Sequence, residues 1–497
     1  MITRRRVLGS SAALAALARR PAWSAVLPAD ARPLTAEERA SHALNRLAFG
    51  PRPADAAAIQ AQGPKRWLAD FIATQLAPES VALPEPLTQR LAALDTLPLT
   101  VAELMARYRE AQRLGREARR EGAAAAGDAR RELVQPIAQQ ARAQRLLRAI
   151  DSPAQLQELL VDFWFNHFNV FAGKGAVAVL VGDYERRAIR PHVLGSFRAM
   201  LGASAKHPAM LLYLDNAQSV GGPAARAGRG LNENYARELM ELHTLGVDGG
   251  YAQRDVTELA RMLTGWTIGS GDEFRFEPRR HDAGAKQWLG RTIAPAGQAE
   301  GELALDLLAT HPATARHIAG QLAQAFVADE PPPALVQRMA DRFLAAQAQP
   351  DQLRQVMHTM IASDEFWRRE AWGAKFKTPY QYLLSSLRAV DAPPPGDLQP
   401  LLGALAQAGM PLYGAQTPDG YKNTAAAWMN AEALAQRIQL AQTLNQRLRR
   451  SGLGADAQTL LATLGPSISP GTRETVAAEP AALQLALLLG SPDFMHR

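Results

Sequence analysis

Hydrophobic residues recur along most of this chain at intervals of three and four positions, the spacing of an amphipathic helix. Helices are predicted over residues 34–49 and 55–76, separated by the Gly-Pro-Arg-Pro sequence at 50–53. Alanine, leucine, arginine and glutamine dominate, whereas runs of β-branched or aromatic residues are few. The sequence therefore predicts a mainly α-helical fold. Further helices are predicted over 153–170, 232–245 and 254–264, and again from residue 302 onward.

One short β-hairpin is the only departure from this helical pattern that the sequence predicts. Its strands are expected at 274–277 and 288–293. No linker is long or polar enough to require separate domains, so residues 28–497 are expected to form a single large helical domain. Residues 101–150 are expected to form a charged, solvated helical hairpin inserted in that domain, with a break at 122–127.

The composition excludes several classes of protein. The chain has 497 residues, 47% of them hydrophobic, and no cysteine. A folded chain of this size buries roughly three quarters of its surface, which excludes a disordered chain and a small disulfide scaffold. The lack of cysteine also excludes thiolate-ligated zinc, iron–sulfur clusters and thiol nucleophiles.

The N-terminal sequence predicts export. Arg4 and Arg5 precede the small, apolar run 9–18, as in a Tat-type signal peptide, which we assign to residues 1–25. That run is shorter than the about 20 apolar residues that span a bilayer, and no later transmembrane span is predicted. The signal holds five arginines and no acid, so only about +2 of the net charge of +7 belongs to the rest of the chain. We therefore expect a periplasmic or secreted protein that does not bind nucleic acid.

The first polar motif lies in the strongly apolar helix predicted over 153–170. His167 falls near the middle of its apolar arc, with Asp162 and Asn166 on the flank. A histidine that points into an apolar face needs a hydrogen-bond partner there. The motif has two interpretations: a core histidine that ties two helices together, or a ligand or general base.

The densest polar motif is residues 232–244. His243 is predicted to face the interior, as His167 does, so the distance between the two rings is informative. Glu238 and Glu241 share the opposite side of the helix, where they could offer two oxygens to a hard cation. Glu241 and His243, however, project about 160° apart on a regular helix, which argues against one metal site for both. The alternative is a carboxylate network, neutralised by arginine, that braces neighbouring helices.

Two more motifs combine acidic and basic residues. In the helix over 254–264, Glu258 stands at helical spacing between two arginines, a ladder that is structural in most proteins. His281, Asp282 and Lys286 lie in the predicted hairpin, and loops with such residues often serve function. The alternative for this loop is a turn stabilised by the aspartate side chain.

The segment Pro-Asp-Gly-Tyr-Lys-Asn-Thr at 418–424 is a turn that leads into a helix. It is interpreted as a helix entrance, or alternatively as a rim that faces a ligand. No nucleophile elbow, zinc-protease motif, phosphate-binding loop, dinucleotide-binding glycine run or calcium loop is present in the sequence. The cofactor, if there is one, is therefore unknown at this stage.

Several of these segments together resemble the bacterial exported family catalogued as domain of unknown function 1800. The resemblance implies a Tat- or Sec-exported, mainly helical protein. It also implies a gene pairing with a second exported family whose fold resembles sulfatases and alkaline phosphatases. It supplies no reaction and no catalytic residues. The motifs that carry the resemblance are residues 44–51, 163–168, 232–246, 254–266, 281–286 and 376–379.

Two functional hypotheses follow. The first is a cell-envelope enzyme, or a cofactor or metal binder, with hydrolysis as the most natural class and a polar pocket between 153–170, 232–245, 254–264 and the loop 274–290. The second is a non-catalytic exported partner or maturation factor of a sulfatase-like secreted protein, in which the polar clusters are internal braces. The pocket is expected to be lined by His167, Glu238, Glu241, His243 and His281. Supporting roles are expected for Asp162, Asn166, Asn234, Arg237, Glu258, Asp282 and Lys286.

Overall fold

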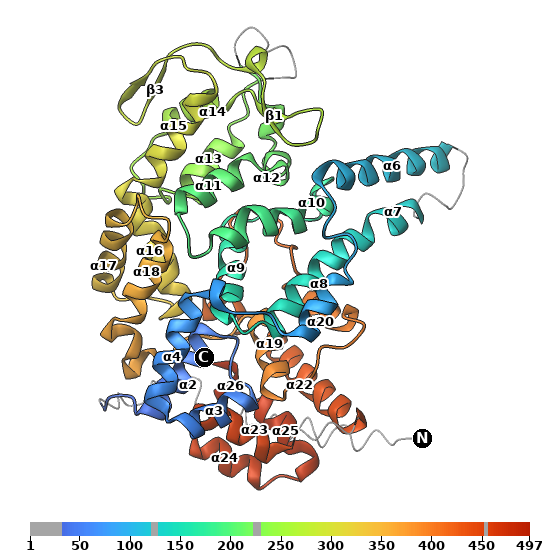
Figure 1. Ribbon diagram of the computed structural model, residues 1–497, viewed down its shortest axis with the longest axis vertical. Helices are drawn as coiled ribbons and strands as arrows, with labels where there is room; N and C mark the ends of the chain where they lie inside the picture. The colour runs from blue at the N-terminus through green and yellow to red at the C-terminus, as the bar shows by residue number, and fades with distance from the viewer. Residues whose placement is uncertain (1–31, 121–127, 222–229, 452–455) are drawn as a thin grey trace.

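The computed structural model describes residues 32–120, 128–221, 230–451 and 456–497. Most of these residues are helical, which confirms the prediction of a mainly α-helical fold (Figure 1). Arg4, Arg5 and the rest of the predicted signal lie outside the described residues, as does the predicted break at 122–127.

The N-terminal part begins with a well-capped helix, α2 (Ala36–Leu47). The Thr35 hydroxyl accepts the Glu38 N–H at 3.2 Å, and the Glu38 carboxylate accepts the Thr35 N–H at 2.8 Å. The segment 55–76, predicted as one helix, forms two, because Gly63 adopts a positive φ of 81° and Pro64 begins the second. The other helices of this part are α3 (Pro53–Gln62), α4 (Pro64–Leu76), α5 (Glu85–Ala92), α6 (Val101–Arg120), α7 (Asp128–Leu133) and α8 (Gln135–Asp151).

The central part carries the polar motifs. Helix α9 (Gln155–His167) lies within the predicted 153–170, whereas α13 (Asn234–Glu241) is shorter than the predicted 232–245. Helix α13 ends early because its last turn has the wider hydrogen bonding of a π-helix. The His243 N–H donates to the Glu238 carbonyl, five residues back, at 3.0 Å. The other helices are α10 (Val177–Tyr184), α11 (Phe197–Lys206), α12 (Pro208–Tyr213), α14 (Gln253–Leu263) and α15 (Gln298–Ala309).

The C-terminal part is again helical. Its helices are α16 (Pro312–Phe326), α17 (Pro333–Ala345), α18 (Gln352–Ile361), α19 (Pro379–Ala389), α20 (Gln399–Gln407), α21 (Ala425–Trp428), α22 (Ala431–Ser451), α23 (Ala457–Leu464), α24 (Pro470–Ala477), α25 (Ala481–Leu489) and α26 (Pro492–Met495).

The described residues contain two short hairpins, so the prediction of a single hairpin over 274–293 is wrong. Strand β1 (Trp266–Ile268) pairs antiparallel with β2 (Phe274–Phe276), and β3 (Lys286–Trp288) pairs antiparallel with β4 (Arg291–Ile293). The segment 288–293 folds back on itself because Leu289 and Gly290 both take positive φ, 46° and 73°, as a tight hairpin turn requires.

The two ends of the described chain pack together in an elongated molecule. Helix α3 contacts α23, and α2 contacts the short turn of helix at Gly465–Ser467 (Figure 1). One buried apolar cluster extends from Ala43 to Met495, with Trp164 of α9 fully buried in it. No helix in the described ranges is long and apolar enough to cross a membrane.

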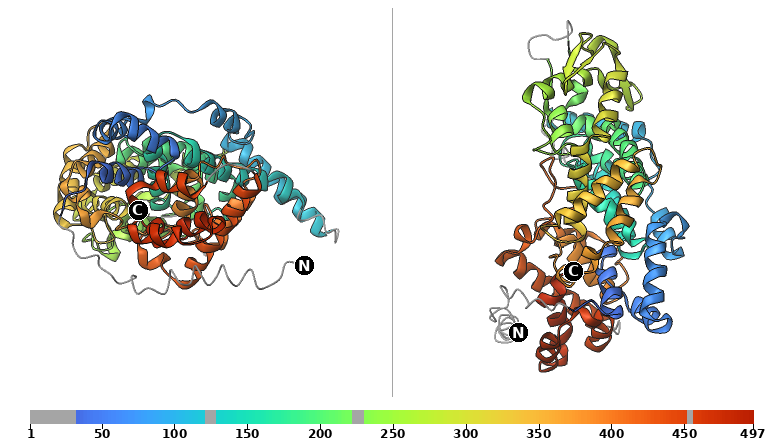
Figure 2. Two further views of the ribbon diagram at one scale, coloured as in Figure 1. Left: turned by 90° about the horizontal axis from the view of Figure 1, so that it is seen from below. Right: turned by 90° about the vertical axis from the view of Figure 1, so that its left-hand side faces the viewer.

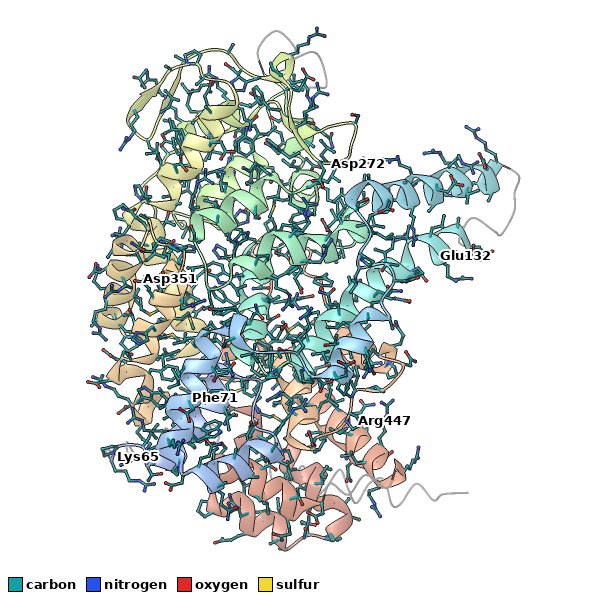
Figure 3. The ribbon with its side chains drawn as sticks, viewed as in Figure 1. Lys65, Phe71, Glu132, Asp272, Asp351 and Arg447 are labelled. Atoms are coloured by element: carbon teal, nitrogen blue, oxygen red, sulfur yellow. The ribbon has the colours of Figure 1, made fainter. Side chains whose placement is uncertain are left out.

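Helices α6 and α7 project from the body as an arm (Figures 1 and 2). This agrees with the predicted charged hairpin, but α8 does not belong to it: α8 lies in the core and buries Ile137, Arg145 and Ile150. At its base the arm is tied to the β1–β2 turn, where Arg109 donates to both carboxylate oxygens of Asp272 at 2.7 and 2.9 Å (Asp272 is labelled in Figure 3).

Candidate functional site

An open pocket of about 230 Å³ lies beside the His167 motif. Its floor comes from α9, one wall from α16, and another from the first turn of α19 together with the loop 410–424. Amide side chains are frequent in the lining, and Phe163 and Tyr421 contribute rings. The amide groups are those of Asn166, Gln321, Gln324, Gln381 and Asn423.

Asn166 holds the 410–424 loop against the floor. Its Oδ1 accepts the Tyr421 N–H at 2.7 Å and its Nδ2 donates to the Tyr421 carbonyl at 2.9 Å. Gly420 makes this approach possible: it has a positive φ of 62°, and a Cβ there would lie 2.5 Å from Asn166 Oδ1. Asn169 donates to two further loop carbonyls at 3.0 and 2.8 Å. The Asn-x-x-Asn spacing thus positions the wall of the pocket.

Asp162 is the acidic group of the floor. Its Oδ1 accepts a hydrogen bond from Arg145 Nη2 at 2.5 Å, and its side chain is only 16% exposed. Burial raises the pKa of Asp162 although Arg145 opposes the shift. Arg145 is shared with Glu185 at 3.4 Å, so its charge is divided between two carboxylates. Asp162 therefore keeps its proton at a higher pH than an ordinary aspartate does.

Asp419 is the second carboxyl group of the pocket, on the loop opposite the floor. Lys422 Nζ donates to its Oδ2 at 2.6 Å, and the Thr417 hydroxyl donates to its Oδ1 at 2.5 Å. Partial burial would raise the pKa of Asp419, but these two hydrogen bonds outweigh it and the net shift is downward. One pocket therefore holds two carboxyl groups whose pKa values are displaced in opposite directions.

Arg497 adds a positive charge beside Asp162. It is 6% exposed, and its Nη2 donates to the Ala325 carbonyl at 2.7 Å. Its Nε and Nη1 have no hydrogen-bond partner in the part of the chain that the structure describes. Burial lowers its pKa to about 10, so the guanidinium stays charged at neutral pH. A buried donor without a partner is costly, which makes Arg497 a candidate anchor for an acceptor group of a ligand.

His167 and His243, both predicted to face inward, lie next to each other. Their ring centroids lie 6.1 Å apart, and His167 Nε2 is 3.1 Å from the His243 carbonyl oxygen. A third ring, that of His317, lies 6.2 Å from His167. Gln321 joins two of the rings: its Oε1 is 2.8 Å from His167 Nδ1, and its Nε2 is 3.0 Å from His317 Nε2.

Burial keeps the His167 ring neutral, and these contacts fix its orientation. Burial, followed by the neighbouring His317, lowers the pKa of His167 to about 4. Each ring nitrogen lies within hydrogen-bond distance of a protein oxygen, and the neutral ring donates to one of the two, so the ring lines the pocket without turning a nitrogen toward it. His243 is buried and does not line the pocket. Of the two interpretations of His167, the structure favours the histidine that ties helices together.

Replacing His167 by Gln is expected to weaken the pH dependence of stability. The native ring has a pKa of about 4 against 6.5 for an ordinary histidine, so the unfolded chain binds the proton first. The contribution of this neutral ring to the free energy of unfolding is therefore fully present above pH 6.5 and is lost as the pH falls toward 4. About 2 kcal/mol of it is lost between pH 7 and pH 5. Urea unfolding of wild type and His167→Gln at both pH values measures the difference. The exposed His358→Gln is the matched control, and an equal pH dependence in wild type and His167→Gln would contradict the prediction.

Glu238 and Glu241 lie near the pocket rather than in it. Burial raises the pKa of Glu238, and the charges of Glu241 and Asp419 raise it further, which indicates that Glu238 is close to the Asp419 loop. Arg237 pairs with Glu233 at 3.5 Å. Within the described ranges, no group of three or more His, Asp or Glu side chains is arranged to hold a metal ion. Asn234, at the start of α13, is exposed, and its N–H donates to Asn232 Oδ1 at 2.9 Å.

His281 is not brought to this pocket, so its predicted place in the lining is wrong. Its Nε2 is 3.1 Å from Glu300 Oε1 and its Nδ1 is 2.9 Å from the Thr264 carbonyl oxygen. Lys286 Nζ forms an ion pair with Glu300 Oε2 at 2.5 Å, and both side chains are fully buried. The loop 274–290 and α14 consequently form no wall of the pocket, because their polar groups bind one another.

The same cluster fastens the second hairpin to α14. Arg261 donates to both oxygens of Asp282 at 3.0 Å and to Glu258 at 2.8 Å. Glu258 in turn accepts the Gln287 N–H at 2.8 Å. Glu258 therefore has the structural part that its helical spacing predicted, and Asp282 and Lys286 are bound within the same cluster.

Several pocket residues were not singled out by the sequence. Asp419 belongs to a turn that was interpreted mainly as a helix entrance, yet it faces the pocket. Arg497 and Gln321 of the lining, and His317 beside His167, had no local signal, because each acquires its role only from a partner far away in the sequence. The Asp-Gly pair at 419–420 is the signal that could have identified the loop.

Comparison with models of protein families gives one match, to the family described as "Protein of unknown function (DUF1800)", over residues 42–496. Comparison with curated proteins and with solved structures gives no match.

Proposed function

The chain belongs to the DUF1800 family, which supplies no activity, and we propose that its pocket carries out acid–base hydrolysis of a small polar substrate rich in hydroxyl groups. The observation that carries the proposal is that the carboxyl groups of Asp162, on α9, and Asp419, on the 410–424 loop, line one pocket, with the pKa of Asp162 raised and that of Asp419 lowered. Two such groups in one pocket suit one general acid and one general base. No third carboxylate and no metal is needed for that division of roles.

In this proposal the protonated Asp162 donates its proton to the oxygen of the leaving group. The Asp419 carboxylate accepts a proton from the attacking water, which forms the new bond to the substrate as the old bond breaks. The two protons then exchange with solvent, so that water is the only other reactant consumed. Side-chain nucleophiles play no part: the Tyr421 hydroxyl already donates to the Pro411 carbonyl at 2.9 Å, and Thr378 Oγ1 caps α19.

The lining supports a hydroxyl-rich substrate. Amide groups both donate and accept hydrogen bonds, and the rings of Phe163 and Tyr421 offer apolar faces for a sugar-like ring. Arg497 supplies the unpartnered donors for an acceptor group of that substrate. Hydrolysis of a glycosidic bond is the reaction that combines these features most directly.

The test is a titration of the two carboxyl groups by carbon NMR in the full chain, with Asp162→Asn and Asp419→Asn used to assign the signals. Asp162 is expected to titrate above the ordinary aspartate value of 3.8, and Asp419 below it. Circular dichroism of both variants checks that the fold is kept. If Asp162 titrates at or below Asp419, the assignment of acid and base is wrong.

Export is a further part of the proposal, supported by Arg4 and Arg5 before the apolar run 9–18.

A second candidate function, that of partner of a sulfatase-like exported protein, is supported by the projecting α6–α7 arm, on which Arg116 and Arg119 are exposed. One experiment addresses both: the full chain is produced in its host and purified from the periplasmic fraction. Absence from both the periplasmic fraction and the culture medium would contradict export, and purification without a second protein would contradict the partner role.

A further inference from the structure

A second concavity lies on the C-terminal half of the molecule and shares helix α19 with the pocket of Asp162. It is a groove of about 270 Å³ between α19, α20 and α22 (α22 carries Arg447, labelled in Figure 3). None of the Asp162 pocket's lining residues lines it. Its walls are mainly aliphatic, formed by Leu383, Leu401, Ala404, Leu405, Ala408 and Leu440.

Arg437 of α22 is the charged group of this groove. It is 2% exposed, and its guanidinium lies over the rings of Phe376 and Tyr382, 4.2 and 5.2 Å from their centroids. Its Nη2 donates to the Lys377 carbonyl at 2.6 Å. Its Nε and Nη1 have no hydrogen-bond partner among the residues that the structure describes.

The charge of Arg437 is not balanced by the protein around it. Burial lowers its pKa to about 10, so it remains a cation at neutral pH. No ion pair to a carboxylate joins Arg437 within the described part of the chain, and the neighbouring Lys377, also buried, is a second base. Buried charges in proteins are normally paired, because an unpaired one loses its hydration without compensation.

We propose that this groove binds a medium-chain aliphatic carboxylate, with the hydrocarbon chain along the aliphatic walls and the carboxylate at Arg437. A guanidinium binds a carboxylate through charge-assisted hydrogen bonds, and Arg437 Nη1 has no partner among the described residues. The volume is slightly below the about 300–1,000 Å³ of pockets for drug-sized ligands, which favours a chain of medium length. Neighbouring side chains cover Nε and Nη1, so binding includes a movement of the Arg437 side chain toward the groove.

The proposal does not rest on hydrolysis in the Asp162 pocket. It is tested by calorimetric titration of the full chain with decanoate, kept below the concentration at which micelles form. Wild type is expected to bind one decanoate, and Arg437→Met is expected to bind it about 10- to 100-fold more weakly. Decanol, which has the same chain without the charge, is expected to bind weakly and equally to both proteins.

Two more variants keep the test decisive. Arg447→Met removes the exposed arginine at the edge of the same groove and is expected to change decanoate affinity by less than twofold. Ala404→Phe fills the groove without touching the charge, and is expected to abolish binding even if Arg437→Met proves unstable in thermal unfolding. The proposal is overturned if wild type does not bind decanoate, if Ala404→Phe binds it unchanged, or if the loss follows Arg447 instead of Arg437.

Discussion

Replacing Lys286 by Met is expected to lower the free energy of unfolding by about 3–5 kcal/mol. Lys286 and Glu300 form an ion pair at 2.5 Å with both side chains fully buried. Glu300 also accepts N–H groups of Ala296 and Gly297 at 2.8 and 3.1 Å, so its carboxylate is fixed in place and cannot turn to water. The variant would therefore leave a buried carboxylate without its cationic partner. Chemical unfolding at pH 7 measures the loss.

Two further variants show whether the unpaired charge is the cause. Lys65→Met makes the same chemical change at an exposed position and is expected to alter stability by less than about 0.5 kcal/mol (Lys65 is labelled in Figure 3). The double variant Lys286→Met with Glu300→Gln removes both the ammonium and the carboxylate of the ion pair, so no unpaired charge remains. Part of the stability lost in Lys286→Met is therefore expected to return. A loss of less than about 1 kcal/mol in Lys286→Met alone would show that the cluster does not fasten the hairpin.

Replacing Asp162 by Asn is expected to lower kcat/KM for hydrolysis by about 10²- to 10⁴-fold, the usual contribution of a general acid. Asparagine keeps the size of the side chain and can still accept the hydrogen bond from Arg145, but it has no acidic proton to give to a leaving group. The measurement is the hydrolysis of a panel of nitrophenyl glycosides by the full chain.

The pH profile separates this role from a structural one. Because the pKa of Asp162 is raised, wild-type activity should fall as the pH rises and Asp162 loses its proton. Asp419 sets the acid side of the profile, where its carboxylate becomes protonated. The Asp162→Asn variant should lose the alkaline limb, whereas Asp70→Asn, an exposed control, should keep both rate and profile. A variant Asp162→Asn with more than half of the wild-type activity would contradict the assignment.

The helical phase was sufficient to predict which side chains face inward. His167 and His243 were placed on buried faces, and their rings meet at 6.1 Å between centroids. The same reasoning identified the motif around Asn166 and the ladder at Glu258. These predictions succeed because burial is a local consequence of amphipathic spacing.

Residue spacing could not identify the partners from distant segments. His281 looked like a companion of His167, but Glu300 and Lys286 hold it in another cluster. Arg497 lies beside Asp162 although more than 300 residues separate them in the chain. The predicted strand pairing was wrong for a related reason. The positive φ of Leu289, which closes β3 onto β4, is set by the fold around this residue and not by its side chain.

The 410–424 loop is fastened at many points through its main chain, and the buried Tyr413 is its main side-chain anchor, donating to Glu185 Oε2 at 2.9 Å. Asn166 and Asn169 bind backbone groups, the Tyr213 hydroxyl donates to the Gln416 carbonyl, and the Ala172 N–H donates to the Tyr413 carbonyl. Apart from Gly420 and the buried Leu412 and Tyr413, the path of the loop thus makes little demand on side-chain identity. Relatives of this protein can therefore diversify their specificity by exchanging loop side chains over an unchanged scaffold, and a designer who wishes to retarget the pocket can vary the same positions.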